Sequence, residues 1–204
     1  MNDLKNVVFD IGNVLLNWDP RGLYKTIFGR DEFDGHHLNE IIGSDIWLEM
    51  DRGTADIEET IGKLEPLYPD SIDEIGRFIR EVASHIQPFE DSFCLARECK
   101  DAGMGVYLLS NFGEEAFKTV RSRIDDFEIF DGGIISWEVN LIKPEPRIYE
   151  LLLSEHDLNP SQTLFIDDSA PNIEAAEKLG IKVLHLPVGT NLRAAYEGLT
   201  ARCH

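Results

Sequence analysis

Short apolar runs alternate with helical stretches along most of the chain. The apolar runs are short enough to predict buried parallel strands. Between most of them, apolar spacing and end signals predict helices. These helices span residues 90–101, residues 111 to about 124 (where Asn111 is followed by Glu114 three residues on), residues 146–155, and the stretch from Pro171 to Gly180. This alternation predicts an α/β fold, a doubly wound, Rossmann-like parallel sheet with helices on both faces. The predicted strands are residues 5–10, 106–110, 134–137, 163–168 and 182–187.

Residues 15–84 interrupt the alternation, because they show helical periodicity and no convincing strand. Apolar residues at positions i, i+4 and i+7 occur twice in this stretch, within residues 57–64 and 75–82. Ser71 followed by Glu74 is a capping-box pattern at the start of the second of these helices. A crossover of roughly 70 residues is far longer than one connecting helix needs. We therefore predict an α/β core domain of residues 1–14 and 85–204, with a helical cap domain of residues 15–84 inserted over one end of the sheet.

The charge balance argues against several kinds of partner. The chain of 204 residues carries 38 Asp and Glu against 19 Lys and Arg, a formal net charge of −19. This excess repels nucleic-acid phosphates and anionic lipid surfaces, so we expect neither nucleic acid nor a membrane as partner. No apolar run approaches the ~20 residues of a membrane span, and the first residues do not resemble a signal peptide. The odd set of three cysteines (Cys94, Cys99 and Cys203) lacks metal-ligand spacing, which favours a cytoplasmic location; the oligomeric state stays open.

Reactive side chains follow four of the predicted strands. Asp10 ends the first strand, Ser110 and Asn111 end the second, Lys143 follows the third, and Asp167 and Asp168 end the fourth. In a doubly wound sheet, ligands bind beyond the carboxyl ends of the strands. Carboxylates beside a lysine at that edge suggest a divalent metal next to an anion, because Mg²⁺ prefers carboxylate oxygens, waters and substrate phosphate. Such a site can use one carboxylate as a nucleophile toward phosphorus, with lysine and serine holding the phosphoryl oxygens.

Each of these residues alone has a simpler explanation. An aspartate at a strand end, or a serine such as Ser110, is often a helix cap or turn former, and Lys143 before a proline is typical of a solvated surface. Asp167 and Asp168 are less easily explained, since adjacent acids repel each other unless a cation compensates. The combination, in this order and at strand ends, favours a catalytic site.

At these residues the sequence resembles the haloacid dehalogenase-like hydrolase superfamily. Four stretches carry the resemblance, and the predicted cap matches the small cap that the family places after its first strand. Within the family the chain is similar to sugar-phosphate phosphatases of the α-glucose-1-phosphatase type, whose cap contains a phrase like Asp51-Arg52-Gly53 followed by Ile57-Glu58-Glu59. The four stretches are Val-Val-Phe-Asp10-Ile-Gly12-Asn13-Val14, Leu-Leu-Ser110-Asn111, Lys143-Pro144-Glu145-Pro146-Arg147-Ile148-Tyr149 and Phe-Ile-Asp167-Asp168-Ser169-Ala-Pro-Asn172.

The resemblance implies a role for each residue of these motifs. It implies that Asp10 attacks phosphorus and becomes an aspartyl phosphate, which water then hydrolyses. The implied Mg²⁺ ligands are the Asp10 carboxylate, the Gly12 carbonyl and Asp168, with Asp167 binding directly or through water. Ser110, the backbone N–H of Asn111 and Lys143 are implied to hold the phosphoryl group. The implied activity is a Mg²⁺-dependent phosphatase acting on a small phosphorylated metabolite, a sugar phosphate above all.

One position departs from the pattern of most phosphatases in the superfamily. They have a second aspartate two residues after the nucleophile, acting as general acid and base, where this chain has Gly12. A positioned acid–base group typically contributes about 10²–10⁴-fold to the rate. A substrate hydroxyl, water or another side chain replaces it, or the enzyme is slow, or it prefers good leaving groups. The glycine also argues against a phosphomutase.

Other candidate residues carry weaker signals. Trp18, which directly follows the first motif, and Trp47 are candidates for the substrate pocket, although aromatic residues at such spacing are more often core. His36 and His37 lie in a polar stretch without an evident third metal ligand. Two alternatives to a phosphatase remain: a 2-haloacid dehalogenase using the same aspartate without a metal, and a non-catalytic binding or regulatory module that has kept the fold.

Overall fold

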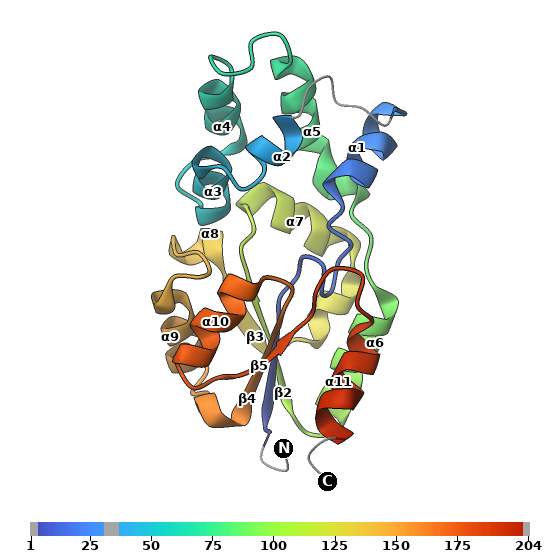
Figure 1. Ribbon diagram of the computed structural model, residues 1–204, viewed down its shortest axis with the longest axis vertical. Coiled ribbons are helices and arrows are strands. Elements are labelled where there is room, and N and C mark those ends of the chain that lie inside the picture. Colours follow the sequence, from blue (N-terminus) through green and yellow to red (C-terminus); the bar gives the residue numbers. More distant parts are fainter. Residues whose placement is uncertain (1–3, 31–36, 202–204) are drawn as a thin grey trace.

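In the computed structural model, which describes residues 4–30 and 37–201, five parallel strands form one sheet (Figure 1). The strand order is β3-β2-β1-β4-β5, so the first strand lies at the centre and the chain winds outward in both directions. This arrangement confirms the predicted doubly wound α/β fold. The strands are β1 (Asn6–Phe9), β2 (Gly105–Ser110), β3 (Gly132–Ile135), β4 (Thr163–Asp167) and β5 (Lys182–His185).

Helices cover both faces of the sheet, and each face has its own hydrophobic core. Val7 and Phe9 of β1 belong to one core and Val8 to the other, as expected for a strand whose side chains alternate between faces. All three side chains are fully buried, which explains the unbroken apolar run in this strand. The helices of the core region are α6 (Glu90–Asp101), α7 (Glu114–Arg123), α8 (Ser136–Val139), α9 (Pro146–Glu155), α10 (Ala170–Lys178) and α11 (Leu192–Ala201), with short 3₁₀ turns at Asp125–Ile129 and Pro160–Gln162.

The predicted insert is helical and lies over one end of the sheet (Figure 1). The longest helix of the insert, α5, buries Ile75, Ile79 and Val82 and packs against both α1 and α7, so it joins the insert to the core. Its α4 begins with a capping box between Asp56 and Glu59. The exact domain boundaries stay a prediction. The insert consists of α1 (Pro20–Phe28), α2 (His37–Ile41), α3 (Asp45–Arg52), α4 (Ile57–Leu64) and α5 (Ile72–His85).

The third strand is displaced from its predicted position. It begins at Gly132, and the residues from Ser136 onward form α8 instead of extending the strand. A side chain on Gly133 would come within 2.5 Å of the Leu108 carbonyl on the neighbouring strand, so glycine is required for close pairing there. Glycines carry no hydrophobic signal, and the prediction therefore started the strand two residues too late.

One predicted capping box and one predicted helix start are wrong. Helix α5 begins after Ser71 as predicted, but Ser71 makes no side-chain capping bond, and Glu74 accepts hydrogen bonds from Tyr24 and Arg30 of the insert. Helix α7 is capped by Gly113, and Asn111 uses its side chain elsewhere. In both cases a long-range contact replaces the local capping contact that the sequence suggested.

Among the residues that the structure describes, no helix is both long enough and apolar enough to cross a membrane. Cys94 and Cys99 are free thiols. Cys203 and His36 lie outside the described residues.

Candidate active site

The carboxyl ends of the three central strands meet at one point below the insert. Phe9 of β1 pairs with Leu108 of β2 and with Ile166 of β4, so the residues that follow them lie side by side. The Asp10 N–H also donates to the Ile166 carbonyl at 2.9 Å. This register brings Asp10, Ser110 and the Asp167–Asp168 pair to one edge. With Lys143 we call these residues the sheet-edge cluster.

Lys143 is the centre of this cluster. Its Nζ lies 2.8 Å from Asp10 Oδ1 and 2.6 Å from Asp167 Oδ2, and it donates to the Leu109 carbonyl at 2.9 Å. Three acceptors satisfy the three donors of an ammonium group. The lysine residue is only 3% exposed, so the sequence-based alternative of a surface lysine is wrong.

Burial shapes the charges of the cluster. Desolvation raises the pKa of Asp10 to about 7, although the charge of Lys143 opposes this rise. Burial alone would lower the pKa of Lys143, but the carboxylates of Asp10 and Asp167 outweigh it and raise that pKa above its ordinary value. Lys143 therefore stays an ammonium group, and it favours the ionised form of the carboxylate that it contacts.

Asp167 is fully engaged by protein donors. Its Oδ1 accepts from the Ser169 N–H at 2.8 Å and from Asn172 Nδ2 at 3.1 Å, and its Oδ2 accepts from Lys143 and Asn172. Asn172 is itself buried and held by the helix turn that begins α10. Asn172 belongs to the fourth motif, and its two hydrogen bonds orient the Asp167 carboxylate.

Asp168 faces a tight loop that follows β1. Asn13 Nδ2 donates to Asp168 Oδ2 at 2.9 Å, and burial raises the pKa of Asp168. Asn13 has a positive φ of 55°, a conformation that asparagine tolerates better than most residues. This turn places Gly12 at the wall of the same cavity as Asp10 and Asp168.

The donor set at this edge fits a magnesium ion. One carboxylate oxygen from each of Asp10, Asp167 and Asp168 lies within 4.8 Å of the other two. The three ionised carboxylates and the one ammonium group leave two negative charges, which a divalent cation balances. Hard oxygen donors are the ligands that Mg²⁺ prefers. Since protein donors occupy Asp167, the residues best placed to hold the ion directly are Asp10 and Asp168.

Asn111 fixes the position of Lys143. Its Oδ1 accepts from the Lys143 N–H at 2.7 Å, and its Nδ2 donates to the Lys143 carbonyl at 2.9 Å. This paired contact holds the loop that carries the lysine against the end of β2. Ser110 is buried beside Asp10, and its hydrogen bond lowers the pKa of that carboxyl.

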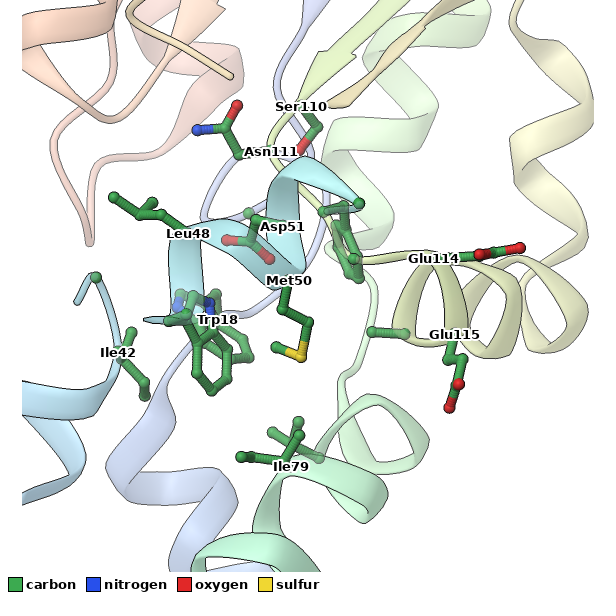
Figure 2. Close-up of a pocket in the computed structure, with 18 of the residues that line it drawn as sticks. Trp18, Ile42, Leu48, Met50, Asp51, Ile79, Ser110, Asn111, Glu114 and Glu115 are labelled. Atoms are coloured by element: carbon green, nitrogen blue, oxygen red, sulfur yellow. The ribbon is translucent and has the colours of Figure 1, made fainter. Parts of the chain in front are cut away.

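A cavity of about 680 Å³ opens from the sheet-edge cluster into the insert. Its far part is lined by apolar side chains, and we call this part the apolar chamber. Trp18 and Trp47 both line the cavity, with ring centroids 6.2 Å apart, as the sequence suggested for a pocket. Figure 2 shows Ser110 and Asn111 on one side and the apolar chamber on the other. The chamber is formed by Trp18, Ile42, Leu48, Met50 and Ile79.

Asp51 lines this cavity and had no role assigned from the sequence. It lies near the end of α3, and Figure 2 shows it between Ser110 and Asn111 on one side and Trp18 on the other. Desolvation raises its pKa to about 7, while hydrogen bonds from the Trp47 side chain and the Gly113 N–H oppose the rise. The sequence signal for Asp51 was the Asp51-Arg52-Gly53 phrase. It was linked only to the cap of similar phosphatases and to no chemical role.

Comparison with known proteins identifies the family. A model of the haloacid dehalogenase-like hydrolases matches residues 4–180, which is most of the chain. The chain belongs to this family. It is therefore a hydrolase with the family's α/β core, as the sequence motifs indicated.

Several relatives cover nearly the whole chain. A sesquiterpene phosphatase from Aspergillus oryzae is 29% identical over 89% of this chain and 89% of its own length. A D-ribitol-5-phosphate phosphatase from Bacteroides thetaiotaomicron is 24% identical over 93% of this chain and 95% of its own. A crystal structure of a haloacid dehalogenase-family enzyme from the same bacterium, in complex with magnesium and inorganic phosphate, superposes with a TM-score of 0.75 at 24% identity, covering 95% of this chain and 99% of that one. This superposition supports the fold.

Proposed function

We propose that this hydrolase is a Mg²⁺-dependent phosphatase that acts on a small phosphorylated metabolite. The observation that carries the proposal is the sheet-edge cluster, in which a buried ammonium group bridges two carboxylates at the mouth of a cavity. The names of the two relatives, both phosphatases, support the same reaction class. In this proposal the cluster supplies the nucleophile and the metal site, and Ser110, the Asn111 N–H and Lys143 form a phosphate clamp.

In this proposal Asp10 is the nucleophile. Its carboxylate attacks phosphorus, the ester bond to the alcohol breaks, and an aspartyl phosphate forms on Asp10. Lys143, Ser110 and the Asn111 N–H hold the phosphoryl oxygens and offset their charge during transfer. Asp10, the Gly12 carbonyl and Asp168 would hold Mg²⁺, with Asp167 binding it through water. The metal supplies charge neutralisation at the phosphoryl group.

The lining of the cavity bears on the leaving group. A sugar phosphate, the substrate that the sequence resemblance implies, needs polar partners for its hydroxyl groups. The apolar chamber instead offers aromatic and aliphatic side chains such as Trp18, Leu48 and Ile79. Burying apolar surface contributes about 25 cal/mol per Å², so this lining favours the phosphate ester of an apolar alcohol. We place such esters ahead of sugar phosphates, and the name of the sesquiterpene phosphatase agrees with that order.

A substrate panel tests the reaction and the leaving group together. Inorganic phosphate release is measured with prenyl phosphates, alkyl phosphates and sugar phosphates, each with Mg²⁺ and with EDTA. We expect Mg²⁺-dependent release that Asp10→Asn abolishes, with the highest kcat/KM for apolar esters. Asp45→Asn, an exposed aspartate of α3 outside the cavity, is the matched control and is expected to behave as wild type.

The same panel separates the two alternatives. Metal-independent phosphate release, or full activity of Asp10→Asn, contradicts the proposal. Chloride release from 2-chloropropionate without metal identifies a dehalogenase instead, although the third carboxylate in the cluster gives that reaction no advantage. No turnover of any ester, with no rise in melting temperature on adding Mg²⁺ and beryllofluoride, favours a binding module.

A further inference from the structure

The sheet-edge cluster contains no evident proton donor for the leaving group of an alkyl phosphate. Breaking the ester bond leaves negative charge on the alcohol oxygen, which is a poor leaving group unless a proton reaches it. The position two residues after Asp10 is Gly12, which has no proton to give. Lys143 is committed to three acceptors in the cluster. An ionisable group elsewhere in the cavity wall can supply this proton.

We propose that Asp51, on the inserted helix α3, is the general acid and base of this enzyme. This inference rests on the proposed phosphatase function. It assigns a catalytic role to a residue of the insert, whereas the nucleophile and the phosphate clamp all come from the core. The complete catalytic site then includes residues from both the insert and the core.

Hydrogen bonds fix Asp51 against the edge of the sheet. Its carboxyl accepts from the N–H of Gly113, three residues beyond Ser110, and from the indole of Trp47. Its backbone carbonyl accepts from Ser136 Oγ, which in turn accepts from the Phe112 N–H at 2.8 Å. These contacts hold the end of α3 to the loop that follows Ser110 at the end of β2.

The neighbouring residues make the same connection on the other side. Arg52 Nη2 lies 2.6 Å from Glu145 Oε1, just beyond Lys143, and Asn140 Nδ2 donates to the Arg52 carbonyl at 3.0 Å. A side chain on Gly53 would come within 2.5 Å of the Trp137 carbonyl, so α3 could not end this close to the core with another residue there. The Asp51-Arg52-Gly53 phrase is thus a second place, besides α5, where the insert contacts the core.

The place of Asp51 in the cavity matches the place of the leaving oxygen. In a phosphate monoester, one oxygen joins the phosphoryl group to the alcohol carbon. With the phosphoryl group at Ser110 and the alcohol in the apolar chamber, that oxygen lies at the boundary between them. Figure 2 shows Asp51 at this boundary, with Ser110 and Asn111 on one side and Trp18 and Met50 on the other.

The other carboxyls in the cavity wall are less suited to proton transfer. Asp56 and Glu59 are tied to each other's backbone in the capping box of α4. Glu114 and Glu115, at the start of α7, are exposed, and Glu114 pairs with Lys118. Apart from the sheet-edge cluster, Asp51 is the enclosed carboxyl among the described residues that line this cavity.

The ionisation of Asp51 suits an acid that works near neutral pH. Burial raises its pKa to about 7, so a large fraction carries a proton at pH 7. The charged groups that face the same cavity are Glu114 and Glu115 from α7, Asp56 and Glu59 from α4, and the sheet-edge cluster. None of these charges determines the shift. Desolvation raises the pKa of Asp51, and its two hydrogen bonds only partly oppose that rise.

The two chemical steps balance with Asp51 in this role. In the first, the Asp10 carboxylate forms a bond to phosphorus, the ester bond breaks, and its electron pair takes the Asp51 proton, giving a neutral alcohol and an ionised Asp51. In the second, water attacks the aspartyl phosphate while the Asp51 carboxylate accepts one of its protons. The Asp10 carboxylate is regenerated, phosphate is released, and Asp51 again carries a proton.

The leaving group provides a test that a merely structural role would not pass. Asp51→Asn is compared with wild type on hexyl phosphate, whose alkoxide needs a proton, and on p-nitrophenyl phosphate, whose phenolate does not. Because kcat/KM reports only the steps up to release of the alcohol, we expect kcat/KM for hexyl phosphate to fall by about 10²–10⁴-fold and kcat/KM for p-nitrophenyl phosphate by less than about 10-fold. In wild type, kcat/KM for hexyl phosphate falls as pH rises above about 7, and this limb disappears in Asp51→Asn.

Equal losses in kcat/KM on the two esters would overturn the proposal, because they would show that Asp51 does not protonate the leaving group. Asp51→Glu keeps an acid and should keep most activity on hexyl phosphate; a loss as large as that of Asp51→Asn would also contradict the role. Asp10-dependent turnover of p-nitrophenyl phosphate by wild type is the control for the proposed function. If wild type lacks this turnover, the proposed function has failed, independently of Asp51.

Gly12 allows an independent rescue. A Cβ at this position would have its nearest contact at 3.8 Å from the Trp18 Cβ, so an aspartate fits there. Gly12→Asp in the Asp51→Asn background should restore at least about 10-fold of the lost rate on hexyl phosphate. Asp45→Asn is the control and should leave both esters unaffected. Failure of the rescue in a folded, Mg²⁺-binding double variant would contradict a missing proton as the defect.

Discussion

The sheet-edge cluster and the apolar chamber share one cavity but are built in opposite ways. In the cluster, polar groups are buried and paired: Lys143 has three acceptors and Asp167 accepts from three residues. In the chamber, the walls are mostly apolar side chains from the insert, and one carboxyl, Asp51, stands at its edge. The cluster is fixed by direction-dependent contacts, whereas the chamber is defined by shape and apolar surface.

This contrast assigns different tasks to the two regions. A network of satisfied charges holds reacting atoms within narrow limits, which transfer of a phosphoryl group requires. An apolar wall discriminates only weakly, by about 1–3 kcal/mol per methylene, and can be altered without disturbing the chemistry. We therefore expect changes in the cluster to remove activity and stability together, and changes in the chamber to alter substrate preference alone.

Lys143→Met should have the largest effect. It leaves the carboxylates of Asp10 and Asp167 buried together without their ammonium partner, and breaking a buried pair in this way costs about 3–5 kcal/mol. We expect a reduced free energy of unfolding in urea and a loss of at least about 10²-fold in kcat. Lys118→Met, which removes an exposed lysine of α7, should change neither quantity.

A second variant sharpens this result. Lys143→Met combined with Asp167→Asn removes the repulsion between the two carboxylates, so part of the lost stability should return while activity stays low. If Lys143→Met unfolds at the same urea concentration as wild type, the lysine does not hold the cluster together, and our interpretation of this region is wrong.

Leu48→Asn should have a smaller effect that is confined to the chamber. Leu48 lines the apolar chamber on α3, and a polar side chain there weakens contact with an apolar leaving group. We expect KM for a long-chain alkyl phosphate to rise about 10-fold while kcat/KM for methyl phosphate is unchanged. Leu67→Asn is the matched control, because Leu67 is 60% exposed and lies outside the cavity wall. Equal effects on the long and short esters would argue against the chamber as the alcohol site.

Asp51→Asn should change stability in a way that depends on pH. Burial raises the folded-state pKa of Asp51 to about 7 from 3.8, so between these values the folded protein holds a proton that the unfolded chain has lost. Wild type therefore loses stability relative to Asp51→Asn as pH rises from 4 to 7, and the difference is constant above 7. Melting curves with saturating Mg²⁺ should show Asp51→Asn gaining about 10 °C on wild type over this range. A difference that does not vary with pH would show that Asp51 is not perturbed.

The sequence predicted the cluster better than the chamber for a physical reason. Asp10, Ser110 and Asp167 follow strands directly, so the parallel sheet alone brings them together once the strands are placed. The chamber depends on how the helices of the insert pack, and helical spacing gives the buried face of each helix but not its neighbour. Trp18 and Trp47 were predicted to line the pocket only as aromatic residues, without the partner that each one contacts.

The errors have the same origin. The start of β3 was missed because it consists of two glycines, which leave no apolar pattern: a Cβ on Gly132 would meet the His156 ring, and one on Gly133 would meet the Leu108 carbonyl of the neighbouring strand. Asn111 and Ser71 were assigned to local caps, but Asn111 bonds to Lys143 and Glu74 to residues of α1 and the turn that follows it. Asp51 was not assigned because nothing in a single helix shows that its last turn docks beside Gly113.

The most direct test of the account is to trap the phosphorylated enzyme. Wild-type protein with Mg²⁺ is mixed with a turnover substrate, quenched in acid and digested, and the peptide that contains Asp10 is examined by mass spectrometry. We predict a gain of one phosphoryl group on Asp10 that hydroxylamine removes and that Asp10→Asn lacks. A substrate that turns over at the same rate with no phosphoryl group on Asp10, or with the group on another residue, would contradict the central claim that this carboxylate is the nucleophile.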